Sequence, residues 1–217
     1  MGQRTKIKVC GLTRLADAVA AAELGADYLG FVFAPSPRRL DLGEARKFWA
    51  DLPPDVARVG VFRDQKAREV AATIEEFPVD YIQLHGSESP AICRSFSRPV
   101  IKAFSPRSVE ELSVLELYRG VADLFLVDLP KEDPSAAVLP LEVGRAATAL
   151  GKPTLLAGGL DPENVGDFVR ELHPWGVDVA RGVEAEPGTK DLSRMKDFFE
   201  AVRKAAAAPA VRPGGAS

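Results

Sequence analysis

Cysteine is scarce in this sequence of 217 residues, which contains only two. Cys10 and Cys93 lie far apart, without a CxxC pair or the Cys/His spacing of a zinc site, so neither a disulfide framework nor a metal centre is expected. A dinucleotide-binding fingerprint is also absent, and we therefore expect no cofactor. Cysteine usage of this kind fits a reducing compartment.

Long apolar runs and a large excess of one charge are likewise missing. No run approaches the roughly 18 to 20 apolar residues that a membrane span needs, and the first residues lack the apolar segment of a signal peptide. The formal net charge is −3, and no block of lysine and arginine points to a nucleic acid or a membrane surface as partner. We expect a cytoplasmic protein, monomeric or homodimeric, that acts on a small molecule.

Short apolar segments recur along the chain and alternate with stretches of helical periodicity. The eight apolar segments cover residues 7–10, 28–33, 58–62, 79–84, 99–104, 124–128, 153–157 and 177–180. Helical periodicity is clearest in residues 15–25, 43–52, 67–77, 108–118 and 163–172. The apolar segments are continuous, as in parallel strands that are buried on both faces. The alternation predicts an α/β fold, a single (β/α)8 TIM barrel, with an open doubly wound sheet as the structural alternative.

The barrel domain is expected to cover residues 1–204, and residues 205–217 to form a flexible C-terminal tail. The tail is rich in alanine, proline and glycine, which bury too little surface to offset the entropy cost of ordering. Two helix boundaries are also predicted. Asp161 is expected as an N-cap before Pro162 at the first helical position, and Gly25 as a left-handed residue after a helix.

The active site of such a barrel lies where the carboxyl ends of its strands meet. Polar residues and glycines at the predicted strand ends are therefore the candidates for the site. They are Cys10 after the first strand, Arg38 and Arg39 after the second, Gln83 and His85 at the fourth, Asp128 at the sixth, Gly158 and Gly159 after the seventh, and Arg181 and Gly182 after the eighth. A thiol, a carboxylate, arginines and glycine turns are thus expected around one mouth.

Cys10 and Asp128 are the candidates for proton transfer. A lone cysteine is commonly a small buried hydrophobe, which is how we interpret Cys93, but a nearby cation at a strand end can lower a thiol pKa and make the sulfur a base or nucleophile. Asp128 can cap a turn or act as a general acid opposite the thiol. The residues alone leave both alternatives open.

Glycines in the last two loops predict a phosphate site. The segment AGGLDPENV places Gly158 and Gly159 between a strand and a helix, and RGVE places Gly182 after the last strand. Backbone N–H groups at helix N-termini bind phosphate, and these two loops commonly do so in this fold. Ordinary turn glycines are the alternative.

The histidines and arginines also have structural interpretations. His85 is expected to be a hydrogen-bonded residue near the mouth, and His173 to be solvated at the far end of a helix. Arg38 and Arg39 can clamp a substrate carboxylate with paired hydrogen bonds, or belong to a surface loop.

Several motifs occur in the order in which they occur in one known family. They are KVCGLT (8–13), GFVFAPSPR (30–38), VGVF (59–62), QLHG (83–86), VIKAF (100–104), LVD (126–128), LAGGLDPENV (156–165) and GVDVARGVEAEPGTKD (176–191). On these motifs the chain resembles the phosphoribosylanthranilate isomerases. The resemblance implies a cofactor-free Amadori rearrangement of N-(5-phosphoribosyl)anthranilate to 1-(2-carboxyphenylamino)-1-deoxyribulose 5-phosphate, a step of tryptophan biosynthesis.

The resemblance also implies roles for individual residues. Asp128 becomes the acid at the furanose oxygen, and Cys10 the base that removes the C2 proton. One arginine is expected to hold the anthranilate carboxylate, for which the SPR motif favours Arg38 and the distance from the cysteine favours Arg39. The glycines at 158, 159 and 182 are expected to hold the phosphate.

Two segments depart from the family pattern. The family usually has a glycine-rich segment after the sixth-strand aspartate, whereas residues 129–142 read LPKEDPSAAVLPLE here. The family's VSSGVE reads VARGVE, so Ala180 and Arg181 replace two small hydroxyl residues that can help to bind phosphate. The alternative functions are therefore a catalytically impaired homologue that binds a sugar phosphate or a protein partner, and a related barrel that acts on another ribulosyl phosphate.

Overall fold

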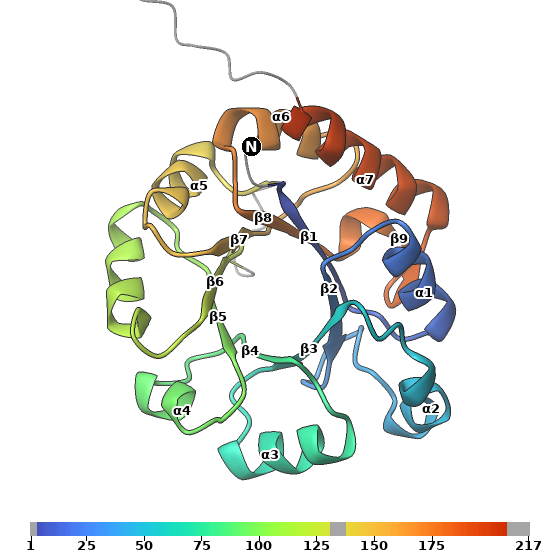
Figure 1. Cartoon of the computed structure of the whole chain (residues 1–217). Helices are drawn as coiled ribbons and strands as arrows, with labels where there is room; N and C mark the ends of the chain where they lie inside the picture. The colour runs from blue at the N-terminus through green and yellow to red at the C-terminus, as the bar shows by residue number, and fades with distance from the viewer. Residues whose placement is uncertain (1–3, 131–137, 208–217) are drawn as a thin grey trace, which may run out of the picture.

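The structure is a computed structural model that describes residues 4–130 and 138–207. Its central strands are all parallel, and each pairs with the next until β8 closes on β1 (Figure 1). The strands are β1 (Lys6–Cys10), β2 (Tyr28–Val32), β3 (Ala57–Phe62), β4 (Tyr81–Leu84), β5 (Val100–Phe104), β6 (Leu124–Val127), β7 (Thr154–Leu156) and β8 (Gly176–Val179). The predicted (β/α)8 barrel is confirmed, and the doubly wound sheet is excluded.

Helices surround the ring of strands on its outer side (Figure 1). The α-helices are α1 (Leu15–Glu23), α2 (Leu42–Phe48), α3 (Ala67–Glu76), α4 (Pro90–Arg94), α5 (Leu141–Thr148), α6 (Val165–Leu172) and α7 (Leu192–Ala207). The 3-10 helices are η1 (Trp49–Asp51), η2 (Glu110–Tyr118) and η3 (Arg181–Val183). After η3, the short antiparallel strands β9 (Glu184–Glu186) and β10 (Thr189–Lys190) form a hairpin that leads into α7.

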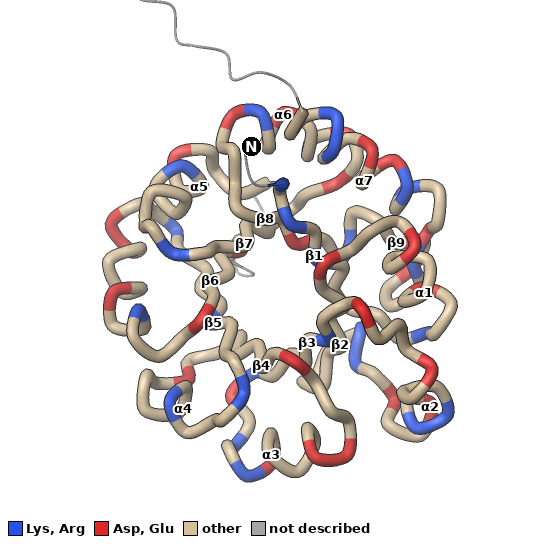
Figure 2. Tube along the Cα trace, viewed as in Figure 1, with Lys and Arg blue, Asp and Glu red and all other residues tan. Residues whose placement is uncertain are grey.

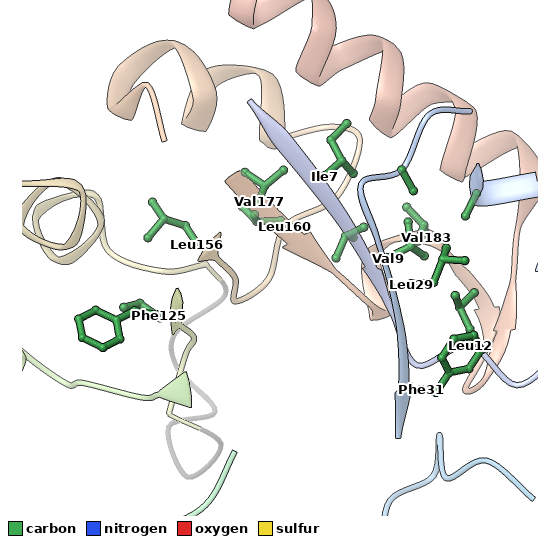
Figure 3. Close-up of a cluster of buried hydrophobic side chains, with 14 of the residues drawn as sticks. Ile7, Val9, Leu12, Leu29, Phe31, Phe125, Leu156, Leu160, Val177 and Val183 are labelled. Carbon is green, nitrogen blue, oxygen red and sulfur yellow. The ribbon is translucent and has the colours of Figure 1, made fainter. Parts of the chain in front are cut away.

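The alternation of side chains along each strand divides the core into two layers. In β1, Ile7 and Val9 pack in the large cluster between the strands and the helices (Figure 3). Cys10 belongs to the smaller cluster inside the barrel, and Lys8 shares its side of the strand. The side chains that carry the chemistry therefore come from the inward-facing positions.

The segment predicted as a helix over residues 108–118 forms the 3-10 helix η2 instead of an α-helix. Leu112 and Leu115 are its buried residues, and Tyr118 is half-buried. A spacing of three residues places these side chains on one line when a helix has three residues per turn. Because the apolar stripe repeats every three residues, the tighter helix buries it better than an α-helix does.

The helix predicted to start after Asp161 begins later, at Val165. Asp161 instead caps a preceding turn, where its Oδ1 accepts from the N–H of Asn164 at 2.9 Å and its own N–H donates to Asn164 Oδ1 at 3.0 Å. The two hydrogen bonds stabilise the turn that leads into the N-terminus of α6. The prediction for Gly25 is confirmed, because this residue follows α1 with φ +87°.

The predicted boundary at residue 204 is corrected, because α7 continues through Ala207. Ala205 is buried against the barrel, so the run of alanines still contributes to the core at this point. Alanine has the highest helix propensity, which explains why the helix outlasts the boundary expected from composition. Residues 208–217 lie outside the described residues, and their assignment as a tail remains a prediction.

Charges of both signs are interspersed around the outer ring of helices (Figure 2). No helix within residues 4–130 and 138–207 is both long and apolar enough to cross a membrane.

The packing of α7 on the barrel is tested by Phe198, which is fully buried. Phe198→Ala should lower the free energy of unfolding by about 3–5 kcal/mol because it leaves a cavity. Leu192 lies in the same helix and is 61% exposed, so Leu192→Ala should change it by at most about 0.5 kcal/mol. Urea unfolding measures both, and equal losses would contradict this packing.

Candidate active site

Cys10 and Asp128 lie at the same end of the barrel. Cys10 is the last residue of β1, and Asp128 directly follows β6. The N–H of Asp128 donates to Phe104 O at 2.9 Å, and its Oδ1 accepts from the N–H of Leu129 at 2.8 Å. Its side chain is 24% exposed. The backbone is thus fixed while the carboxyl group remains open to the mouth.

Charged side chains surround Cys10, which is itself buried. Lys8 Nζ lies 2.9 Å from Asp178 Oδ1, and Lys190 Nζ donates to the backbone carbonyl of Cys10 at 2.7 Å. Burial raises the pKa of the Cys10 thiol and the Asp178 carboxylate adds to this effect, although Lys8 and Lys190 lower the pKa. The cations that could activate the sulfur are present, but burial outweighs them.

Arg38 lies beside Cys10, whereas Arg39 is exposed. The Arg38 side chain crosses Gly11, where an added Cβ would lie 2.7 Å from Arg38 Cδ. Its Nε donates to Glu184 Oε1 at 2.9 Å and its Nη2 to Glu184 Oε2 at 2.7 Å. Of the two arginines predicted from the sequence, Arg38 is thus the one held in place by Glu184, and its charge interacts with Cys10.

Glu184 joins Arg38 to Lys190. Its side chain is 3% exposed, and Lys190 Nζ donates to its Oε1 at 3.0 Å. Burial opposes ionisation of this carboxyl, but Arg38 and Lys190 hold its pKa below the ordinary value. Because Lys190 Nζ also donates to Ala180 O at 3.1 Å, the β9–β10 hairpin ties the end of β8 to the end of β1.

His85 and Gln83 face the mouth from β4 and the loop after it. Gln83 is 1% exposed, and its Nε2 lies 3.0 Å from His85 Nδ1. When the Gln83 amide donates to His85 Nδ1, a neutral imidazole carries its proton on the other ring nitrogen. That nitrogen, His85 Nε2, lies 3.5 Å from Asp128 Oδ2. His85 is thus a hydrogen-bonded residue near the mouth, as expected, and its ring faces the candidate acid.

A further buried ion pair fixes the loop that carries His85. Lys102 Nζ donates to the carbonyls on either side of this residue, Leu84 O at 3.2 Å and Gly86 O at 2.6 Å. It also lies 3.1 Å from Glu88 Oε2, and both side chains are 2% exposed. The loop therefore has little freedom to move the imidazole away from Asp128.

The predicted phosphate glycines allow the last two loops to fold tightly. Gly158 and Gly159 have φ +94° and +71°, in the left-handed region that favours glycine. A Cβ at Gly182 would lie 2.0 Å from Leu160 O, so only glycine permits η3 to pack on the preceding loop. Arg181 is exposed at the start of η3. Of the atypical segment 129–142, residues 131–137 lie outside the described residues.

Sequence reasoning missed Lys8, Asp178, Glu184 and Lys190. Two of them had a detectable pattern: a lysine and an aspartate interrupt apolar strands, and Lys8 precedes Cys10 by two residues, which places both on one face. The prediction for Cys93 is confirmed, since it is buried in α4. His173 is exposed at the end of α6, also as expected.

Comparison with known sequences identifies one family. The profile described as N-(5'-phosphoribosyl)anthranilate (PRA) isomerase matches residues 7–201. An N-(5'-phosphoribosyl)anthranilate isomerase of Acidithiobacillus ferrooxidans is 43% identical over 205 residues, which cover 91% of this chain and 97% of that protein. One of Pseudomonas putida KT2440 is 40% identical over 200 residues, again covering 91% and 97%.

Solved structures give the same result. The phosphoribosylanthranilate isomerase of Thermotoga maritima superimposes with a TM-score of 0.85 at 33% identity, covering 92% of this chain and 99% of that one. A phosphoribosylanthranilate isomerase in complex with reduced 1-(o-carboxyphenylamino)-1-deoxyribulose 5-phosphate superimposes with a TM-score of 0.82 at 32% identity and the same coverage.

The raised pKa of Cys10 predicts a slow thiol at neutral pH. In a Cys93→Ala chain, which leaves one thiol, the rate of iodoacetamide modification should keep rising with pH beyond the ordinary thiol pKa of about 8.5, because only the thiolate reacts. Mass spectrometry measures the modified fraction, and glutathione is the matched control. A rate that levels off at neutral pH would contradict the effect of burial.

Proposed function

The chain belongs to the N-(5'-phosphoribosyl)anthranilate isomerase family, and we propose that Cys10 and Asp128 are the base and the acid of its reaction. The enzyme isomerises N-(5'-phosphoribosyl)anthranilate to 1-(2-carboxyphenylamino)-1-deoxyribulose 5-phosphate in tryptophan biosynthesis. The observation that carries the residue assignment is the position of a thiol and a carboxyl group at the ends of β1 and β6, on one mouth. A ribulosyl phosphate bound across that mouth lies next to both the thiol and the carboxyl group.

Asp128 opens the furanose ring. It donates a proton to the ring oxygen as the C1–O bond breaks, and the nitrogen lone pair forms a C=N bond to C1. The Nε2 atom of His85, 3.5 Å from the carboxyl, stabilises the carboxylate that this transfer leaves. Gln83 holds the ring in that orientation from Nδ1.

Cys10 performs the second transfer as a thiolate. It removes the proton from C2, and the C–H electrons form a C1–C2 double bond while the C=N electrons return to nitrogen. The resulting enolamine gains a proton at C1 and loses the proton of its C2 hydroxyl, which gives the ketone. No atoms are gained or lost overall, as an isomerisation requires.

Arg38 and the loop glycines hold the two ends of the substrate. The N–H groups of Arg38 that do not bond Glu184 bind the anthranilate carboxylate next to Cys10. The phosphate binds at Gly158, Gly159 and Gly182, where Arg181 adds a positive charge that the family's serine lacks. This charge favours an active enzyme over an impaired homologue, because it complements the ligand.

We also propose a cellular compartment and an oligomeric state for the protein. Both cysteines are unpaired and buried, which fits the reducing cytoplasm. A monomer or a homodimer remains the expected oligomeric state.

Loss of either proton-transfer group should slow turnover severely. Cys10→Ala and Asp128→Asn should each lower kcat by roughly 100- to 10 000-fold, the usual contribution of general acid–base catalysis. Substrate fluorescence measures turnover, and circular dichroism checks that the barrel is intact. Activity close to that of the unchanged protein in a folded variant would refute the role of the residue replaced.

The two arginines can be separated by matched substitutions. Arg38→Lys should raise KM by roughly 10- to 100-fold, because lysine keeps the charge but loses the paired donors to the carboxylate. Arg39→Lys is the control and should leave KM unchanged, since Arg39 is exposed. A larger rise for Arg39→Lys would transfer the carboxylate site to that residue.

A further inference from the structure

Lys8 is a buried charged residue that the proton transfers described above do not use. Its side chain is completely buried inside the barrel, where it pairs in register with Asp178 of β8. Burial lowers the pKa of Lys8, but the Asp178 carboxylate and the Cys10 sulfur outweigh burial and raise it above its ordinary value. Lys8 is therefore a fixed positive charge in an apolar interior.

Gly30 leaves the space in which Lys8 and the sulfur meet. Cys10 lies opposite Gly30 in the pairing of β1 with β2. A Cβ atom added at Gly30 would lie 2.9 Å from Cys10 Sγ and 3.1 Å from Lys8 Nζ. The ammonium group and the sulfur thus both border the volume that any larger residue would fill, and they are close enough to interact electrostatically.

We propose that Lys8 is a positioning residue that makes the buried Cys10 sulfur ionisable, and that Asp178 controls how much of the Lys8 charge the sulfur receives. The inference rests on the proposed role of Cys10 as the base. A thiol in an apolar barrel retains its proton, and a nearby ammonium group stabilises the thiolate. Asp178 keeps Lys8 protonated but repels the same thiolate. The two residues therefore act on the sulfur in opposite directions.

The other charges that face Cys10 are weaker candidates for this task. Lys190 approaches from β10 and Arg38 from the loop after β2, and both are positive. Both are ion-paired with Glu184, as Lys8 is with Asp178, so the three cations differ in their position relative to the sulfur. Lys190 donates to the backbone carbonyl of Cys10, whereas Lys8 Nζ and Cys10 Sγ border the same space beside Gly30.

The test is a titration of Cys10 without substrate, in full-length Cys93→Ala protein. The ultraviolet absorbance of the thiolate and the rate of iodoacetamide modification both report its ionisation. Lys8→Met should raise the midpoint by about one pH unit or more, because a neighbouring opposite charge is lost. Asp178→Asn should lower the midpoint, because a like charge is lost. The rising limb of the pH profile of kcat/KM should move in the same directions.

Two further variants keep the test decisive. If Lys8→Met does not fold, the double variant Lys8→Met/Asp178→Asn leaves no unpaired charge, and its midpoint should exceed that of Asp178→Asn by about one unit or more. Lys102→Met/Glu88→Gln is the matched control, because it removes a buried ion pair that lies away from Cys10, and the Cys10 midpoint should not move.

Shifts in opposite directions support the proposal. Unmoved midpoints, or shifts in the same direction in Lys8→Met and Asp178→Asn, would overturn it and leave the pair a structural role only. Because the titration needs no substrate, its failure is distinct from failure of the proposed catalytic role, which would appear as turnover by the Cys10→Ala protein.

Discussion

The register of β1 against its two neighbours is the constraint on which the site depends. It sets Cys10 opposite Gly30 on one side, and Lys8 opposite Asp178 on the other. Because side chains alternate along a strand, a slip of one residue would turn Lys8 and Cys10 toward the helices and Ile7 and Val9 into the barrel. Burial of the apolar residues against the helices thus determines which face of β1 presents the thiol.

Buried lysine–carboxylate pairs recur around the mouth. Lys8 pairs with Asp178, Lys102 with Glu88, and Lys190 with Glu184. Removal of both charges from water costs free energy that good geometry and further hydrogen bonds must offset, so such pairs are weak sources of stability. Their value here is positional. They set the charge next to the sulfur, hold the carbonyls beside His85, and attach the hairpin to the end of β1.

The fold was predictable because its main pattern is local. Eight apolar segments and the helical stretches between them repeat along the chain, and the barrel is the closed form of that repeat. The predictions that were wrong concern the type of one helix and the end of another, which depend on finer geometry. A three-residue stripe selected a 3-10 helix for residues 110–118, and alanine propensity carried the last helix through Ala207.

The candidate site was only partly predictable, for a different reason. Strand ends located Cys10 and Asp128. The position of the Arg38 side chain depends on whether a guanidinium can cross Gly11 to reach Glu184, which sequence spacing does not determine. The charges around Cys10 were missed because their partners lie far away in the sequence. Asp178 and Lys190 each come from the last quarter of the chain.

That separation has a consequence for biosynthesis. The bond from Lys190 to the Cys10 carbonyl joins residues 180 positions apart, so β1 acquires its electrostatic environment from a segment that is synthesised much later. Contacts of such long range form late and slow the folding of a chain. Until then the thiol lacks Asp178, Lys190 and the closed barrel wall, and the nascent chain carries an ordinary cysteine. The electrostatic environment of Cys10 therefore forms only when the whole barrel has closed.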